Sequence, residues 1–244
     1  MKEIKNIILT GATGGLGAEI LSILIKKRFN VVISSRNEED LVELKNGLNG
    51  GRNIFPLAFN FSHLSKVDEF VEKASAFLGG RVDVLINNAG IGYHSKIENI
   101  VLKELEEVFY VNSIGPIILT SKLLPALRKS KNPHVINISS FLGEKVMNYA
   151  VAYAATKHAI NGFSKGLRLE EATNNIKVTI IEPGAIDTNF VERTHDVEAK
   201  EIFQKRKIKK MSPVYIAGWV EKIIDSNKFV CPEVLRIAPT EQVI

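Results

Sequence analysis

Short runs of aliphatic and β-branched residues alternate along the chain with longer stretches whose apolar residues recur at helical spacing. The short runs predict strands near Ile4–Leu9, Val31–Ser34, Ile54–Ala58, Val82–Ile86, Val135–Ile138, Val178–Ile181 and Leu235–Ile237. The longer stretches predict helices at about Leu16–Lys27, Glu38–Leu48, Leu64–Leu78, Val101–Arg128, Tyr153–Thr173 and Val214–Asp225. This repeated succession of strand and helix predicts an α/β fold, a doubly wound parallel sheet of about seven strands with helices on both faces.

The predicted strands carry apolar residues at consecutive positions, as in the runs IIL, VVI and VLI. A strand that is covered by helices on both sides buries both of its faces, so this pattern favours a parallel sheet inside the protein. Ligands of such folds bind at the carboxyl ends of the strands, near the point where the strand order reverses. We therefore expect the functional residues just after the strands.

The composition is that of an ordinary globular protein. Of the 244 residues 45% are hydrophobic and 24% are charged, which is enough apolar material for a full core. We find no linker that would divide the chain, and α/β folds often reach this length as one unit. We expect a single domain over residues 1–244.

Cysteine content, apolar runs and charge indicate the compartment and the partners. The single cysteine, Cys231, cannot form an internal disulfide, which favours a reducing cytoplasm. The N-terminal apolar run is too short for a secretion signal, and no apolar stretch approaches bilayer length. The net charge of +5 comes from scattered Lys and Arg without an RNA-binding motif. We expect a cytoplasmic protein that binds neither nucleic acid nor membrane. No Cys/His cluster in the sequence has the spacing of metal ligands, so we expect no bound metal.

A glycine-rich turn, TGATGGLG at residues 10–17, joins the first predicted strand to the first predicted helix. Glycine lets the backbone turn sharply and approach a pyrophosphate, and a helix N-terminus supplies unpaired N–H groups and a positive dipole end. The spacing is TGxxxGxG rather than GxGxxG, and it is not a P-loop because no Lys-Ser/Thr follows the glycines. The turn predicts a nucleotide cradle formed by Gly11, Thr13, Gly14, Gly15, Leu16 and Gly17.

The end of the second predicted strand indicates which nucleotide binds. An acidic residue at this place would hydrogen-bond the ribose 2′-hydroxyl of NAD, but the chain has Ser34, Ser35 and Arg36 instead. The forked donors of Arg36 suit a 2′-phosphate, and Ser35 can add a hydroxyl. Arg36 also fits an ordinary surface residue, yet the missing carboxylate favours NADP(H) over NAD(H).

Tyr153 and Lys157 stand four residues apart in a helical stretch, and Ser140 ends a strand-like run upstream. The spacing puts a phenol and an ammonium on one helix face, where the cation is expected to lower the phenol pKa. Tyr153 would then be a general acid, with Ser140 binding the substrate carbonyl oxygen. Alone, the same spacing also fits a packed ring and a solvated lysine.

Six landmarks in order resemble one family over nearly the whole chain, the classical short-chain dehydrogenases/reductases. They are the glycine turn, Asn87-Asn88-Ala89-Gly90, Asn112, the group Ser140, Tyr153 and Lys157, Pro183-Gly184, and Thr188. The resemblance implies a Rossmann-type fold and a homodimer or homotetramer built on the long fourth and fifth helices.

The resemblance also implies roles for particular residues. Tyr153 would donate the proton, Ser140 would hold the carbonyl oxygen, and Lys157 would lower the tyrosine pKa and bind the nicotinamide ribose. Asn112 would kink its helix and hold a water that relays protons to Lys157. The cofactor would further contact Asn60, where the family commonly has Asp, and Asn88, Ala89, Gly90, Pro183, Gly184, Ile186 and Thr188.

A polar segment at about 189–212 takes the place of the family's substrate lid. Phe190 and Phe203 can wall a substrate pocket or simply pack, and Tyr93 and His94 can border it. The basic run KRKIKK, Lys205 to Lys210, can attract an acidic partner or form a solvated face.

These features favour an NADPH-dependent reductase of a ketone or aldehyde. One alternative is a 3-oxoacyl-thioester or acyl-carrier-protein reductase, although the C-terminus lacks the Gly-Gly ending typical of many such members. An alternative of another class is a non-catalytic NADP-binding sensor. Such a sensor would be expected to lose Tyr153 or Lys157, and this chain retains both.

Overall fold

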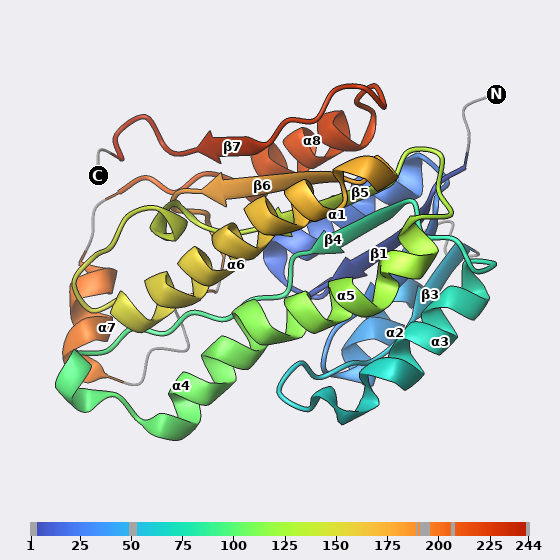
Figure 1. Cartoon of the computed structure of the whole chain (residues 1–244). Coiled ribbons are helices and arrows are strands. Elements are labelled where there is room, and N and C mark those ends of the chain that lie inside the picture. The colour runs from blue at the N-terminus through green and yellow to red at the C-terminus, as the bar shows by residue number, and fades with distance from the viewer. Residues whose placement is uncertain (1–3, 49–52, 189, 191–195, 206–207, 243–244) are drawn as a thin grey trace.

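A seven-stranded parallel sheet forms the centre of the protein, with strand order β3-β2-β1-β4-β5-β6-β7. The computed structural model describes residues 4–48, 53–188, 190, 196–205 and 208–242. Helices lie on both sides of the sheet (Figure 1). The predicted Rossmann-type doubly wound fold is therefore confirmed.

The bounds of the elements are as follows. The strands are β1 Asn6–Thr10, β2 Asn30–Ser34, β3 Ile54–Pro56, β4 Val84–Asn87, β5 His134–Ile138, β6 Lys177–Pro183 and β7 Val234–Ile237. The α-helices are α1 Gly15–Lys26, α2 Glu38–Asn46, α3 Val67–Phe77, α4 Leu102–Phe109, α5 Gly115–Leu127, α6 Val151–Glu170, α7 Val197–Gln204 and α8 Pro213–Ile224.

Two elements differ from the expectation. The long helix predicted at Val101–Arg128 is divided into α4 and α5 by a wider, π-helical turn at Tyr110–Ile114. A further helix, α7, lies in the polar segment for which only a lid was expected. Both differences fall beside the candidate site.

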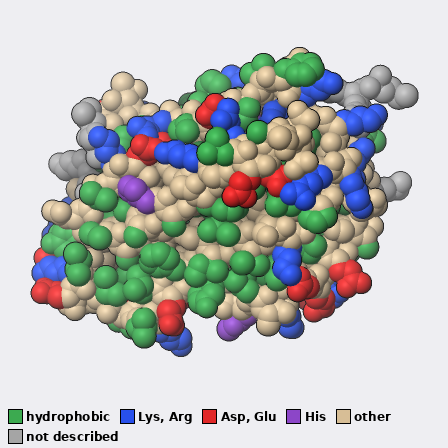
Figure 2. All heavy atoms as spheres, viewed as in Figure 1, with side chains coloured by type: hydrophobic (Ala, Val, Ile, Leu, Met, Phe, Trp, Pro, Cys, Tyr) green, Lys and Arg blue, Asp and Glu red, His purple; other side chains and the backbone are tan. Residues whose placement is uncertain are grey.

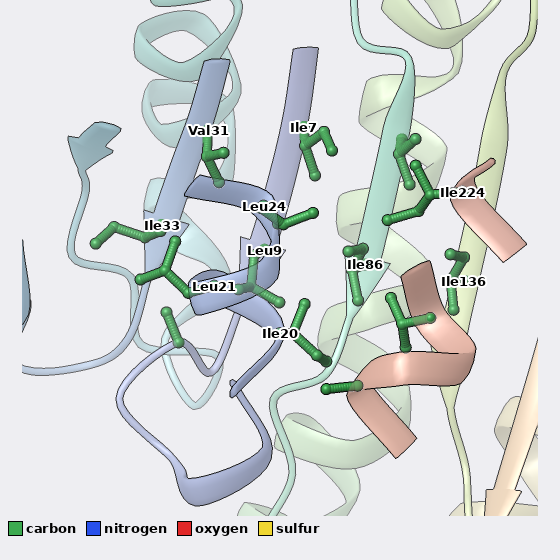
Figure 3. Packing of buried hydrophobic residues seen from close by; sticks show 14 of the residues in the cluster. Ile7, Leu9, Ile20, Leu21, Leu24, Val31, Ile33, Ile86, Ile136 and Ile224 are labelled. Carbon is green, nitrogen blue, oxygen red and sulfur yellow. The ribbon is translucent and has the colours of Figure 1, made fainter. Parts of the chain in front are cut away.

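Alternate residues of each strand point to opposite faces of the sheet, and each face has its own core. Ile7, Leu9 and Ile33 pack with α1 and α8 on one face, and Figure 3 shows this packing. Ile8 and Leu85 pack with α3 and α5 on the other face. Because both faces are buried, consecutive strand positions must be apolar, which is the pattern seen in the sequence.

The strand order reverses between β1 and β4, the usual binding edge of such a sheet. β1 pairs with β2 on one side, with Thr10 opposite Ser34, and with β4 on the other, with Leu9 opposite Ile86. The segments that follow β1, β2 and β4 therefore begin at one edge of the sheet. Within the described part of the chain, no helix is both long and apolar enough to span a bilayer.

Candidate active site

The turn after β1 is shaped so tightly that two of its glycines cannot be replaced. Gly11 has φ +66°, and a Cβ there would lie 2.8 Å from the Cα of Ala89. A Cβ at Gly17 would lie 2.1 Å from the carbonyl oxygen of Gly11. Helix α1 begins directly at Gly15, and its first turn is built of Gly, Leu, Gly and Ala. The turn thus presents a positive helix end without a competing carboxylate, which fits a pyrophosphate.

Asn88 and Thr10 hold this turn against the end of β4. The side-chain nitrogen of Asn88 donates to the carbonyl oxygens of Thr10 and Gly11, each at 3.0 Å. The Thr10 hydroxyl accepts from the backbone N–H groups of Asn88 and Ala89, each at 3.0 Å. The predicted NNAG element therefore fixes the cradle as well as bordering it.

Arg36 lies at the end of β2, beside a carboxylate that the sequence did not indicate. Its Nη1 is 3.9 Å from Oε1 of Glu107 on α4, and 56% of its side chain is exposed. The Ser35 hydroxyl donates to the carbonyl oxygen of Asn37. Oδ1 of Asn60 accepts from the backbone N–H of Ser62, and Asn60 lines the cavity.

The side chains of Ser140, Tyr153 and Lys157 meet at the other end of the site. Tyr153 and Lys157 are buried on α6, with the Lys157 ammonium nitrogen 5.7 Å from the centre of the Tyr153 ring. Lys157 donates to the carbonyl oxygen of Ile138 at 3.0 Å. Ser140 hydrogen-bonds the Tyr153 hydroxyl, and its own Oγ accepts from the backbone N–H of Leu142 at 3.1 Å.

The pKa values of this pair differ from the sequence expectation. Burial raises the pKa of Tyr153 above its usual value, and the hydrogen bond from Ser140 opposes this only in part. Burial lowers the pKa of Lys157 to about 8. The expected lowering of the phenol pKa by Lys157 is therefore not found, because the removal of the phenolate from water dominates and only Ser140 opposes it. A raised pKa keeps Tyr153 protonated, as a proton donor must be.

Asn112 lies in the π-helical turn between α4 and α5, behind Lys157. Its Oδ1 accepts from the backbone N–H of Ile91 at 2.8 Å, and its Nδ2 donates to the Ile91 carbonyl and the Thr156 hydroxyl. A Cβ at Gly90 would lie 3.5 Å from Asn112 Oδ1 and 3.7 Å from Lys157 Nζ. The two polar groups therefore lie near the same point, and a π-helical turn stands where a kink at Asn112 was expected.

One cavity of about 510 Å³ joins the glycine turn to the Tyr153 group. Every catalytic or cofactor-binding residue that the sequence predicted lines it, except Asn112, which lies behind. It also has lining residues that the sequence did not single out, among them Glu107, Phe141, Leu142, Met147 and Gln242. They come from loops and helix faces that carry no motif, so only the tertiary fold shows them.

The candidate substrate end of the cavity has aromatic walls. The Phe190 ring contacts the Tyr153 ring edge to face, with centroids 5.6 Å apart. The centre of the His94 ring lies 6.1 Å from the centre of the Tyr153 ring. Tyr93 instead is buried outside the lining, where its hydroxyl accepts from the backbone N–H of Val101. The side chain of Phe203, like residues 189, 191–195 and 206–207 of the expected lid, lies outside the described residues.

The helix of the lid segment, α7, is attached to the loop that follows NNAG. Oδ2 of Asp196, just before α7, accepts from the backbone N–H of Lys96 at 3.2 Å and from Asn99 at 3.1 Å. The hydrogen bond from the backbone N–H of Ala199 and, after it, those from Asn99 and Lys96 hold the pKa of Asp196 at about 2. Lys210, from the basic run, lines the cavity.

Comparison with known proteins agrees with this geometry. The family model described as short chain dehydrogenase matches residues 5–199. The chain belongs to the short-chain dehydrogenase family. This match confirms the predicted family.

Relatives of this short-chain dehydrogenase occur in animals and bacteria. It is 38% identical over 189 residues to dehydrogenase/reductase SDR family member 7B of Mus musculus, covering 75% of this chain but only 58% of the mouse protein. It is 29% identical over 246 residues to an uncharacterized oxidoreductase of Staphylococcus saprophyticus, covering 99% of both chains. The match thus spans less than two thirds of the mouse relative.

Two solved structures of similar fold are complexes with NADP+ or with a derivative of NADP. An alcohol dehydrogenase from the archaeon Thermococcus sibiricus, complexed with 5-hydroxy-NADP, superposes with a TM-score of 0.85 at 25% identity, over 99% of both chains. The closed form of a serine dehydrogenase complexed with NADP+ has a TM-score of 0.85 at 25% identity and covers 98% of this chain and 96% of that chain.

Proposed function

We propose that this short-chain dehydrogenase reduces a ketone or aldehyde to an alcohol with hydride from NADPH. The observation that carries the proposal is a buried Tyr153 that is hydrogen-bonded to Ser140, in a cavity continuous with the glycine turn. A bound NADPH would supply the hydride for the carbonyl carbon. The protein's own groups supply the proton and stabilise the charge that develops on oxygen.

Tyr153 and Ser140 serve the substrate oxygen. As the carbonyl carbon accepts hydride, its oxygen becomes an alkoxide that takes the Tyr153 proton, and the Ser140 hydroxyl stabilises the same oxygen. Lys157 places an ammonium 5.7 Å from the tyrosine ring, which stabilises the phenolate that remains. Asn112 lies near Lys157 beside Gly90, and we propose that it holds a water that returns a proton from solvent.

Arg36 supports the choice of NADPH. Its guanidinium lines the cavity near the end of β2, where a 2′-phosphate would accept paired hydrogen bonds. Glu107 lies 3.9 Å away and would compete for the same guanidinium, so phosphate binding has to displace this weak pair.

An NADPH-oxidation screen over diketones, aldehydes, keto-esters and acetoacetyl thioesters tests the proposal. Turnover of a small ketone or aldehyde supports it. Turnover confined to thioesters would instead identify a 3-oxoacyl-thioester reductase. Tight NADPH binding without turnover of any class would favour a non-catalytic sensor.

We propose that the protein acts in the cytoplasm without a nucleic acid or membrane partner.

The rate of reduction is expected to fall as the pH rises through about 8. Lys157 is charged below its pKa of about 8 and neutral above it, whereas the raised pKa of Tyr153 keeps the phenol protonated over this range. Measurement of kcat from pH 6 to 10 should show a single-proton decrease centred near pH 8. Lys157→Arg should remove that decrease, because a guanidinium stays charged. A profile flat to pH 9.5 in the wild type would contradict this role.

We also propose that α4, α5 and α6 pair with a second copy of the chain. Figure 2 shows hydrophobic side chains gathered on the face over these helices. Exposed apolar residues of this region include Leu102, Ile114, Val151 and Leu169, and such patches mark protein interfaces. Light scattering on purified protein at micromolar concentration should give at least twice the monomer mass. A monomer at that concentration would contradict the proposal.

A further inference from the structure

Three polar side chains meet behind the loop that carries Ser140, outside the cavity lining. Asn161 lies on α6 one turn beyond Lys157, Glu182 lies near the end of β6, and Arg236 lies on β7. Glu182 is completely buried and Asn161 is 2% exposed. A carboxylate is rarely buried to this degree unless it is paired, so its partners indicate what it does.

The carboxylate of Glu182 joins the other two side chains. Its Oε1 accepts from Asn161 Nδ2 at 2.7 Å. Its Oε2 accepts from Arg236, at 2.8 Å from Nε and 2.7 Å from Nη2. Charge-assisted bonds of this kind are short and fixed in direction, so Glu182 sets the position of both partners.

Both partners hold the residues that follow Ser140. Asn161 Nδ2 also donates to the carbonyl oxygen of Gly143 at 3.0 Å. The Arg236 guanidinium lies 5.2 Å from the centre of the Phe141 ring. The turn between Phe141 and Gly143 is therefore held from two sides by groups that share one carboxylate.

The same turn sets the direction of the Ser140 hydroxyl. Ser140 Oγ accepts from the backbone N–H of Leu142 at 3.1 Å, and the Ser140 carbonyl accepts from the N–H of Gly143 at 2.8 Å. A Cβ at Gly143 would lie 2.5 Å from Asn161 Nδ2, so the turn packs directly on its support. A shift of this turn would move Ser140 Oγ away from Tyr153.

We propose that Glu182 is a positioning residue that acts on the reduction through Ser140, by holding Asn161 and Arg236 against the Phe141–Gly143 turn. The proposal rests on the proposed function, in which Ser140 stabilises the substrate oxygen. A misplacement of about 1 Å in a reacting group can lower a rate about 100-fold. We call the group of Glu182, Asn161 and Arg236 the clamp. Its loss should therefore reduce kcat and leave the Kd for the cofactor unchanged.

The test is a double-mutant cycle between Glu182→Gln and Ser140→Ala. Glutamine keeps the shape and the acceptor for Asn161, but it turns a donor toward Arg236. We expect Glu182→Gln to lower kcat about 10- to 100-fold in the wild type, and less than about twofold in the Ser140→Ala background, because there the clamp has no hydroxyl to position. The Kd for NADPH, measured by fluorescence, should stay unchanged. Asn161→Ala removes the hydrogen bond to the Gly143 carbonyl oxygen directly, and it should lower kcat in the same way.

Glu171 provides a matched control for stability. It is also buried and paired with an arginine, Arg128, but it follows the far end of α6. Glu171→Gln should lower the Tm like Glu182→Gln while leaving kcat within about twofold, since it touches no part of the site.

Each outcome decides one claim. Three results would overturn the clamp. The first is that Glu182→Gln lowers kcat by the same factor in the wild type and in the Ser140→Ala background. The others are an unchanged kcat in both Glu182→Gln and Asn161→Ala, and a loss of kcat in Glu171→Gln as large as that in Glu182→Gln. Unchanged turnover in Ser140→Ala would instead overturn the role of Ser140 and with it the proposed reduction mechanism. If kcat is reduced in Ser140→Ala but unchanged in Glu182→Gln, only the clamp is overturned.

Discussion

Replacing Tyr153 by phenylalanine is expected to lower kcat by about 10²- to 10⁴-fold, the range that general acid catalysis contributes. The change removes only the hydroxyl, because the ring that packs against Phe190 and beneath the Lys157 ammonium is kept. NADPH should therefore bind with its normal Kd, and the Tm should change little. Stopped-flow or steady-state NADPH oxidation, together with fluorescence titration, separates the two quantities.

Tyr93→Phe is the matched control for this experiment. Tyr93 is a second buried phenol next to the site, but its hydroxyl accepts a backbone hydrogen bond outside the cavity lining. Its removal should cost about 1 kcal/mol of stability and leave kcat within about twofold. If Tyr153→Phe and Tyr93→Phe retained the same activity, Tyr153 would not be the proton donor.

Replacing Arg36 by glutamate is expected to raise the KM for NADPH about 100-fold and that for NADH less than about threefold. Hydrogen bonds to a charged group contribute about 1.5–3 kcal/mol, and the new carboxylate would repel the 2′-phosphate in addition. NADH lacks that phosphate, so only the general surroundings of its ribose change. The measurement is the ratio of kcat/KM for the two cofactors.

Two further variants are controls for the Arg36→Glu experiment. Glu107→Gln removes the carboxylate that lies 3.9 Å from Arg36 and should lower the KM for NADPH modestly. Arg168→Glu changes an exposed arginine that pairs with Glu233 elsewhere on the surface, and it should leave the cofactor ratio unchanged. Equal losses for NADPH and NADH in Arg36→Glu would show that Arg36 does not recognise the phosphate.

The fold and the place of the site could be predicted because they depend on local pattern. Each strand carries its own apolar run, and parallel strands bring their carboxyl ends to one edge. Residues as far apart in sequence as Gly11, Ser140 and Thr188 therefore had to lie near each other, and they line one cavity. Tyr153 and Lys157 share a face because α6 is a regular helix.

The remaining features depend on tertiary contacts that no local pattern encodes. The pKa of Tyr153 is set by how completely the folded protein removes the phenol from water. The clamp joins Asn161, Glu182 and Arg236, which are 21 and 54 positions apart in the chain. A polar residue at the end of a strand or on a helix gives no sign of which distant partner it will meet.

The π-helical turn at Tyr110–Ile114 makes the length of the chain at this point part of the site. Such a turn is in effect one residue inserted into an α-helix. Deleting one residue here would remove the bulge and restore regular winding, while α4 and α5 would keep their present phase and their contacts with the rest of the protein. The loss would be local: the amide of Asn112 would leave Ile91 and Thr156. Homologous chains that use Asn112 should therefore keep the number of residues in this segment.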